Sequence, residues 1–142
     1  MTIAAVIKGR EGQVISIGGD ARVADAIAIL AEKRIGALPV IEDGGVVGIF
    51  SERDVIYCLA REGAAALDRR VAEAMTAPVQ TVAPNQGVLA ALSMMTRRRF
   101  RHLPVVESDS LVGFVSIGDL VKYRIDRIEA EAAAMRDYIQ SA

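Results

Sequence analysis

The chain contains one pattern twice. Residues 14–57 align with residues 79–122 without a gap, and 12 of the 44 aligned positions are identical. Both copies carry Leu-Pro-Val, followed by Gly-x-x-Ser-x-x-Asp. A repeat of this kind indicates two copies of one supersecondary unit, each with an apolar face to bury against the other. The sequence therefore predicts a pseudo-two-fold body with a cleft between its halves, and the polar residues shared by both copies are the first candidates for function.

Composition narrows the class of protein. The 142 residues carry a net charge of −1, 52% hydrophobic residues and a single cysteine. This charge balance gives no reason to expect nucleic acid or an anionic membrane as a partner, and no apolar run approaches the roughly 18 residues that cross a bilayer. We found no signal-peptide pattern at the N-terminus. We therefore expect a cytoplasmic protein without a membrane contact, in which Cys58 is a buried structural thiol.

Hydrophobic spacing predicts strand, helix, strand, strand and helix in each copy, which is an α/β (α+β) fold. Strands are expected at 14–17, 37–41, 46–50, 79–82, 102–106 and 111–115, and helices at 23–34, 51–61 and 85–98. Leu67, Val71 and Met75 predict a short amphipathic helix between the copies.

These elements predict how the chain is divided. A first unit is expected at residues 1–63, including the N-terminal segment, and a connecting helix at 64–78. A second unit is expected at 79–125, overlapping a long final helix at 119–141.

The final helix carries an apolar seam. Its members are spaced 4, 3, 4, 3 and 4 residues apart: Val121, Ile125, Ile128, Ala132, Met135 and Ile139. This is the a/d pattern of nearly three heptads, and at 1.5 Å per residue the helix is about 30 Å long. It could fold back on its own domain, but its length favours a contact between two copies of the chain.

The Ser-x-x-Asp element of each copy falls where a strand meets a helix. Its structural interpretation is a capping box, in which Ser51 or Ser116 accepts from a first-turn amide. Its functional interpretation is a nucleotide site, because free amides at a helix start suit phosphate. A carboxylate such as Asp54 or Asp119 can also accept both hydrogens of a ribose diol. The two roles are compatible.

A basic cluster precedes the second Leu-Pro-Val. Four arginines and the only histidine occupy residues 97–102, where cations suit a helix C-terminus. Arg101 and His102 align with the small residues Gly36 and Ala37, so we expect an asymmetric cleft in which the basic pair faces a phosphate. Nucleic acid is an unlikely ligand because only Phe100 is nearby to stack on a base.

Motifs of catalysis are missing. The sequence has no phosphate-binding Walker loop, no GxGxxG, no His/Cys metal cluster and no Ser-His-Asp set with a choice of histidine. We therefore predict that the protein is not an enzyme and holds no metal.

The ordered, duplicated motifs resemble a CBS-domain pair, or Bateman module, of the stand-alone bacterial type over about residues 3–125. The resemblance implies a β-α-β-β-α fold in each copy and an adenosine-containing ligand: AMP first, with ADP, ATP, NAD or S-adenosylmethionine as alternatives. It also implies that Asp54 and Asp119 hold the ribose hydroxyls and that Ser51 and Ser116 contact ribose or phosphate.

The resemblance extends to further ligand contacts. Arg53, Arg101 and His102 match basic positions that contact phosphate, whereas Gly118, aligned with Arg53, has no side chain to do so. The adenine is expected near Ile15, Ile35, Gly36, Gln80 and Phe100. Copy one lacks the basic pair, and its approach to the first strand is about three residues longer than that of copy two. The two sites should therefore differ in affinity.

Two hypotheses follow. The first is a regulatory protein that senses adenine nucleotide, forms a homodimer through its CBS faces and final helix, and signals to an effector protein that the sequence does not identify. The second is a dimeric scaffold without a ligand, in which Ser-x-x-Asp only caps helices.

Overall fold

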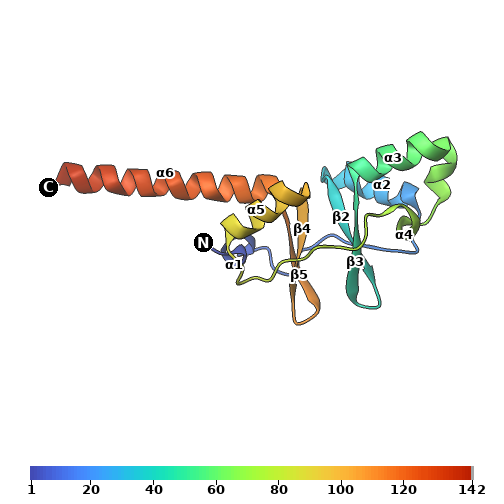
Figure 1. Ribbon diagram of the computed structural model, residues 1–142, viewed down its shortest axis with the longest axis horizontal. Coiled ribbons are helices and arrows are strands. Elements are labelled where there is room, and N and C mark those ends of the chain that lie inside the picture. The colour runs from blue at the N-terminus through green and yellow to red at the C-terminus, as the bar shows by residue number, and fades with distance from the viewer. Residues whose placement is uncertain (142) are drawn as a thin grey trace.

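An antiparallel hairpin forms the centre of each half of the molecule. The computed structural model describes residues 1–141, and Figure 1 shows the two hairpins side by side. The first pairs β2 (Ala37–Glu42) with β3 (Gly45–Ser51), and the second pairs β4 (His102–Glu107) with β5 (Ser110–Ser116). Both have a register shift after the valine of Leu-Pro-Val. The repeat in sequence is therefore a repeat in structure.

The helices of the two copies also correspond. α2 (Val23–Lys33) matches α5 (Val88–Arg98), and α3 (Glu52–Glu62) matches the start of α6 (Ile117–Ser141). α6 extends far from the rest of the molecule (Figure 1). Within residues 1–141, no helix combines the length and the apolar character needed to cross a membrane.

The first strand of each copy is much shorter than predicted. β1 covers only Ile17–Gly18, paired parallel to β2, and the expected strand at 79–82 is a single bridge from Val82 to Val105. The residues just before these bridges line pockets between the halves instead of pairing along the hairpins. Alternating apolar residues were sufficient to suggest strands, but they cannot reveal that the backbone lacks a partner.

The expected connecting helix at 64–78 is replaced by two short pieces. Gly63, at a φ of 64°, ends α3 and begins the 3-10 helix η1 (Gly63–Asp68), and α4 (Val71–Ala74) follows. Arg69 and Arg70 between them are extended, so no single helix forms. Of the predicted apolar positions, Val71 is nevertheless fully buried, and Met75 packs partly buried against the first core.

The N-terminal segment belongs with the second half, not with the first as predicted. Ile3 and Ile7 of α1 (Ile3–Ile7) lie in the same apolar cluster as Val105 and Leu120. Val71 of α4 occupies the matching position and packs into the core of the first half. The helix that precedes each copy thus covers the core of the other copy, which a linear division of the sequence does not reveal.

Each half has its own apolar core. The larger buried side chains of the first core are Val23, Leu38, Val40, Phe50 and Val71, and those of the second are Ile3, Val88, Met95, Leu103, Val105, Val115 and Leu120. Cys58 is buried in the first core and donates to the Val55 carbonyl, as expected for a structural thiol. These cores hold the hairpins and thereby position the residues at their ends.

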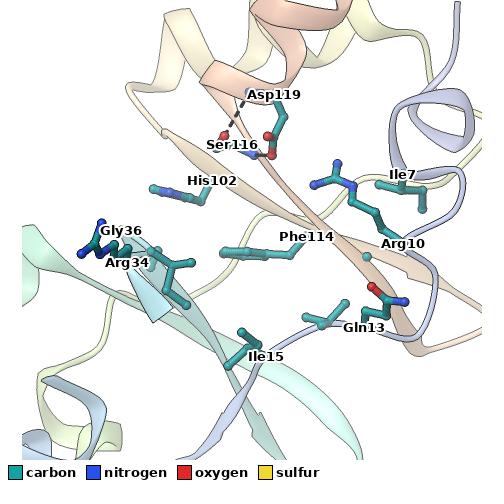
Figure 2. A pocket seen from close by; sticks show the side chains of 14 residues that line it. Ile7, Arg10, Gln13, Ile15, Arg34, Gly36, His102, Phe114, Ser116 and Asp119 are labelled. Carbon is teal, nitrogen blue, oxygen red and sulfur yellow. Dashed lines mark hydrogen bonds between the residues drawn. The ribbon is translucent and has the colours of Figure 1, made fainter. Parts of the chain in front are cut away.

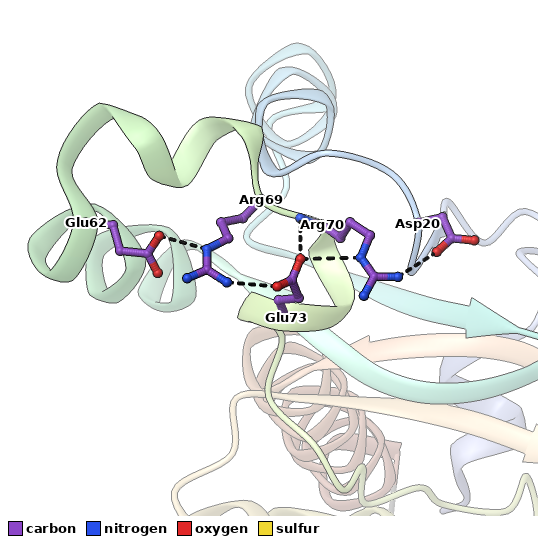
Figure 3. Close-up of polar contacts among 5 residues, drawn as sticks. All are labelled: Asp20, Glu62, Arg69, Arg70 and Glu73. Atoms are coloured by element: carbon purple, nitrogen blue, oxygen red, sulfur yellow. Dashed lines mark hydrogen bonds and ion pairs between the residues drawn. The ribbon is translucent and has the colours of Figure 1, made fainter.

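A chain of ion pairs joins the connecting segment to the first half (Figure 3). Arg69 bridges Glu62 and Glu73 at 2.8 Å each, and Arg70 bridges Glu73 at 3.3 Å and Asp20 at 3.2 Å. The backbone amide of Arg70 and the side chain of Arg69 lower the pKa of Glu73. Exposed ion pairs each contribute little to the free energy of unfolding. The main effect of this network is therefore to position α4 against the first half.

Candidate ligand site

Two pockets lie between the halves, and each is built from both copies. One contains Asp119 and has a volume of about 460 Å³, and the other contains Asp54 and has about 420 Å³. We call them the Asp119 pocket and the Asp54 pocket. Cavities of a few hundred cubic ångströms accommodate a drug-sized or nucleotide-sized ligand. The space between the halves is thus divided into two related cavities, in line with the two sites that the family resemblance implies.

The Asp119 pocket places a polar end opposite an apolar wall. Figure 2 shows Ser116 and Asp119 at the top, Phe114 below them, and Ile15 at the bottom of the view. Its lining residues are Ile7, Arg10, Gln13, Val14, Ile15, Arg34, Ile35, Gly36, Ala37, His102, Gly113, Phe114, Ser116 and Asp119. Three of the residues predicted near adenine, Ile15, Ile35 and Gly36, thus lie in the same cavity as the carboxylate of the opposite copy.

The Asp54 pocket has the same plan with the copies exchanged. Its lining residues are Gly36, Ile49, Ser51, Glu52, Arg53, Asp54, Tyr57, Thr76, Pro78, Val79, Gln80, Arg98, Arg99, Phe100, Arg101 and His102. The predicted adenine neighbours Gln80 and Phe100 therefore come from the second copy. Ser51 and Asp54 come from the first copy, as the pseudo-two-fold requires.

Both Ser-x-x-Asp elements form helix caps. In the first copy, the Ser51 amide donates to Asp54 Oδ2 at 2.9 Å, and the Asp54 amide donates to Ser51 Oγ at 3.4 Å. In the second copy, the corresponding distances between Ser116 and Asp119 are 2.9 and 3.0 Å. This reciprocal pattern satisfies two otherwise free donors at the helix start. The structural interpretation of the motif is thus confirmed, and it leaves the carboxylates facing the pockets.

The two carboxylates differ in what else they accept. Asp54 Oδ1 accepts from the Thr76 hydroxyl at 2.8 Å, and Oδ2 also lies 3.1 Å from Ser51 Oγ. Asp54 is only 8% exposed. Asp119 Oδ1 receives no hydrogen bond from residues 1–141, and this side chain is half-buried. The Asp119 pocket therefore presents an open acceptor, whereas the Asp54 pocket presents an engaged one.

Basic residues line both pockets, which differs from the prediction of cations on one side only. Arg101 lies in the Asp54 pocket with Arg53, as expected. The Asp119 pocket contains Arg10 and Arg34, which the sequence analysis did not select. Arg34 could have been found because it aligns with Arg99 in the repeat. Arg10 lies in the three-residue extension peculiar to copy one, so the repeat gave no signal for it.

Arg34 and Arg99 share an unusual backbone conformation. They end α2 and α5 with φ angles of 53° and 59°, in the left-handed region where glycine is favoured. A side chain there costs about 1–2 kcal/mol. Both residues line a pocket, one in each. Such backbone strain concentrates at functional sites. A role of these guanidinium groups in the pockets would explain why arginine, and not glycine, occupies both positions.

His102 belongs to the wall between the pockets. It lines both, as does Gly36, whose missing Cβ would lie 3.6 Å from the imidazole. The ring stacks on Phe114 with centroids 5.6 Å apart and an interplanar angle of 11°. Burial lowers the pKa of His102, and Arg101 acts in the same direction, whereas the charges of Asp119 and Glu52 oppose the shift. Burial therefore favours the neutral imidazole, whereas an anion bound beside the ring would favour its protonated form.

Among residues 1–141, no group of three or more His, Cys, Asp or Glu side chains is placed to hold an ion. The polar side chains that line the pockets include carboxylates, guanidinium groups, one imidazole, the amides of Gln13 and Gln80, and the hydroxyls of Ser51, Tyr57, Thr76 and Ser116.

A family model described as the CBS domain matches residues 10–61 and 71–126. The chain belongs to the CBS-domain family. CBSX3, a mitochondrial CBS domain-containing protein of Arabidopsis thaliana, is 32% identical over 98% of this chain and 72% of its own length. The crystal structure of a CBS-domain protein from Agrobacterium tumefaciens has 38% identity and a TM-score of 0.82, covering 87% of this chain and 99% of its own.

A third CBS-domain protein bears on the pockets. CBSX2, crystallised in complex with AMP, has 25% identity and a TM-score of 0.76, covering 88% of this chain and 96% of its own. These findings confirm the predicted family and the predicted α/β fold of tandem CBS repeats with a long final helix.

Proposed function

We propose that this CBS-domain pair is a regulatory, non-enzymatic protein that binds an adenosine-containing nucleotide, AMP first, in the pockets between its repeats. One observation carries the proposal: each pocket joins a helix-start carboxylate from one copy to an arginine and apolar residues from the other. The AMP complex of CBSX2 supports the choice of ligand. ATP, NAD and S-adenosylmethionine remain the alternatives to compare.

The chemistry of each pocket fits the parts of such a ligand. The carboxylates of Asp54 and Asp119 accept hydrogen bonds from ribose hydroxyls. Arg53, Arg101 and His102 on one side, and Arg10 and Arg34 on the other, offer charge to phosphate. The apolar side chains beside them provide a surface for adenine.

The pockets should differ in affinity. Asp119 Oδ1 is open, so a ribose hydroxyl can bind there without displacing a protein group. At Asp54 the hydroxyl must compete with Thr76, whose hydrogen bond would be lost. We therefore assign the tighter site to the Asp119 pocket.

Ligand binding would change the relative orientation of the two repeats. A ligand that contacts both copies favours one relative tilt of the repeats, and it shifts the population only by its preference for that tilt. We propose that the protein acts as a cytoplasmic homodimer, through its CBS faces and α6, and that an effector protein reads the change.

The experiment is isothermal titration with AMP, ATP, NAD and S-adenosylmethionine. We expect binding with two unequal affinities, loss of the tighter site in Asp119→Asn and loss of the weaker one in Asp54→Asn. Asp137→Asn, on the exposed part of α6, is the matched control and should bind like the parent. Absence of binding by all four compounds would contradict the proposal.

Glycine at the strained arginines separates binding from stability. Arg34→Gly relieves a left-handed side chain and should raise the unfolding free energy by about 0.5–1 kcal/mol. It should also weaken the Asp119 pocket severalfold. Arg99→Gly should do the same for the Asp54 pocket. A purely structural role predicts the gain in stability with no change in binding.

The second candidate is a dimeric scaffold without a ligand. The observation that favours it is that both Ser-x-x-Asp elements are complete helix caps, which explains the motif without a nucleotide. Because the caps are present under either candidate, the two Asp→Asn variants lose about 1 kcal/mol of stability in both cases. The scaffold candidate is distinguished by titration of the parent, which then gives no heat of binding.

A further inference from the structure

The part of α6 beyond the body has an apolar face that is exposed to solvent. Ile125, Ile128, Met135 and Ile139 are 48%, 47%, 59% and 64% exposed. Figure 1 shows this part of α6 away from both hairpins. Together with Ala132, these residues form the seam with the 4-and-3 spacing of a coiled coil. Packing these side chains against a second helix would remove apolar surface from water, so the seam calls for a partner helix.

The charges beside the seam indicate which partner. With Ile125, Ala132 and Ile139 at a positions, Arg124 and Glu131 occupy g positions, and Glu129 and Arg136 occupy e positions. In a parallel, in-register pair, each g residue faces the e residue five positions later on the partner. Arg124 then faces Glu129, and Glu131 faces Arg136. Both of these charge pairs are attractive, and each occurs twice because the two helices are related by a two-fold axis.

We propose that α6 pairs with α6 of a second copy as a parallel, in-register coiled coil whose register is set by the pairs Arg124–Glu129 and Glu131–Arg136. This inference rests on the homodimer of the proposed function and adds its orientation. It requires no residue outside this chain.

Antiparallel arrangements fit less well. With the two seams fully overlapped, Glu131 would face Glu131 and Glu129 would face Glu129, which is repulsive. A shift by one heptad pairs Arg124 with Glu131 but leaves Met135 and Ile139 beyond the overlap. The opposite shift leaves Val121 uncovered. Only the parallel pair satisfies the charges and covers the whole seam.

A parallel pair also determines how the bodies meet. Its two-fold axis runs along the helices, so both bodies lie at the same end of the pair. α3 and the start of α6 lie along the same edge of the molecule in Figure 1, and Ile56 and Val121, which occupy matching repeat positions, are both exposed. Each repeat would therefore face the same repeat of the second copy, and both nucleotide modules would point the same way.

Cysteine crosslinking tests the orientation. Ala132→Cys places a thiol at an a position, which meets its own copy across a parallel in-register pair at a distance that a disulfide can bridge. Under mild oxidation we expect most of this variant as a covalent dimer. Ala130→Cys, on the opposite side of α6, is the matched control and should stay uncrosslinked, as should the parent, because Cys58 is buried. Failure of Ala132→Cys to crosslink while the protein is dimeric would overturn the parallel register.

Charge reversal tests the register. Glu131→Arg should weaken the dimer about tenfold in analytical ultracentrifugation, because it converts two attractive pairs into two repulsive ones. The double variant with Arg136→Glu restores the pairs and should recover parental affinity. Asp137→Arg, on the outer face, is the control for the charge change itself. None of the antiparallel registers pairs residue 131 with residue 136, so absence of rescue would overturn the proposal.

The two proposals fail separately. A protein that binds AMP but stays monomeric, or crosslinks only through other positions, refutes the coiled coil and leaves the nucleotide site standing. A crosslinked dimer that binds none of the four compounds refutes the nucleotide site and leaves the coiled coil standing.

Discussion

The same motif has different surroundings in the two halves of this molecule. Asp54 is held by Ser51 and by the Thr76 hydroxyl, whereas Asp119 is held by Ser116 alone. The difference arises from the segment that precedes each copy. The segment before copy two places Thr76 next to Asp54, because the Thr76 backbone pairs with Ile49. The segment before copy one is longer and brings Arg10 into the Asp119 pocket. Duplicated chemistry can thus be differentiated by a linker without altering the motif.

The contacts around the exchanged helices differ in the same way. α4 is fixed by the ion pairs of Figure 3, which include Arg69, Arg70 and Glu73. Met1 and Thr2 lie before α1, where Arg69 and Arg70 lie before α4. The Thr2 backbone forms a bridge with Gly87. The first half therefore uses ion pairs, whereas the second half uses main-chain pairing and a contact from Arg124 to the Met1 sulfur. The second half thus depends more heavily on the apolar contacts of Ile3 and Ile7.

The largest expected effect tests the exchange of helices. Ile3→Ala should cost about 3 kcal/mol, because it removes a fully buried side chain from the second core. Val71→Ala at the matching position should cost about 2 kcal/mol, because fewer atoms are removed. Urea denaturation measures both. If α1 did not cover the second core, Ile3→Ala would behave like a change at exposed Ala4.

The next effect compares two glycines at which a preceding segment crosses a hairpin. A Cβ on Gly48 would lie 2.9 Å from the Thr76 carbonyl oxygen, which is backbone, and 2.6 Å from Met75 Sδ. A Cβ on Gly113 would lie 3.0 Å from Ile7 Cδ1, which is a side chain. We expect Gly48→Ala to cost about 3 kcal/mol and Gly113→Ala about 1 kcal/mol in urea melts. Equal losses of unfolding free energy would show that the backbone beside Gly48 adjusts to a methyl group as readily as the Ile7 side chain beside Gly113.

A smaller effect would make the two carboxylates alike. Thr76→Val removes the donor to Asp54 Oδ1 and should cost about 1.5 kcal/mol, because an acceptor that is almost fully buried loses its partner. Thr76→Ser retains the hydroxyl and is the matched control. Under the proposed function, titration with AMP should then give two affinities closer together than in the parent. An unchanged Thr76→Val melt would mean that Asp54 is held by Ser51 alone.

The sequence was a good guide where both copies agree. The hairpins at Leu-Pro-Val and the capped helices after Ser51 and Ser116 follow from the repeat, because matching residues occupy matching positions. The family resemblance, not the repeat, indicated that Ile15, Gln80 and their neighbours lie near the carboxylate of the opposite copy. It was a poor guide where tertiary contacts decide. The exchange of α1 and α4 depends on which core each helix reaches, and Arg10 reaches its pocket only because the loop before Val14 is longer.

The smallest effect concerns the wall that both pockets share. Because burial lowers the pKa of His102, the unfolded chain, with a histidine pKa of about 6.5, binds a proton at a higher pH than the folded chain does. Stability should therefore fall as the pH drops below about 7 and the unfolded histidine becomes charged. His102→Gln should lose less stability than the parent between about pH 7.5 and about pH 5.5 in urea melts, a range in which histidine titrates. Equal losses in the two proteins would mean that His102 is already free to charge in the folded state. A phosphate in either pocket would stabilise the imidazolium, so saturating AMP should shrink the difference between parent and variant, which links the shared wall to occupancy of the pockets it separates.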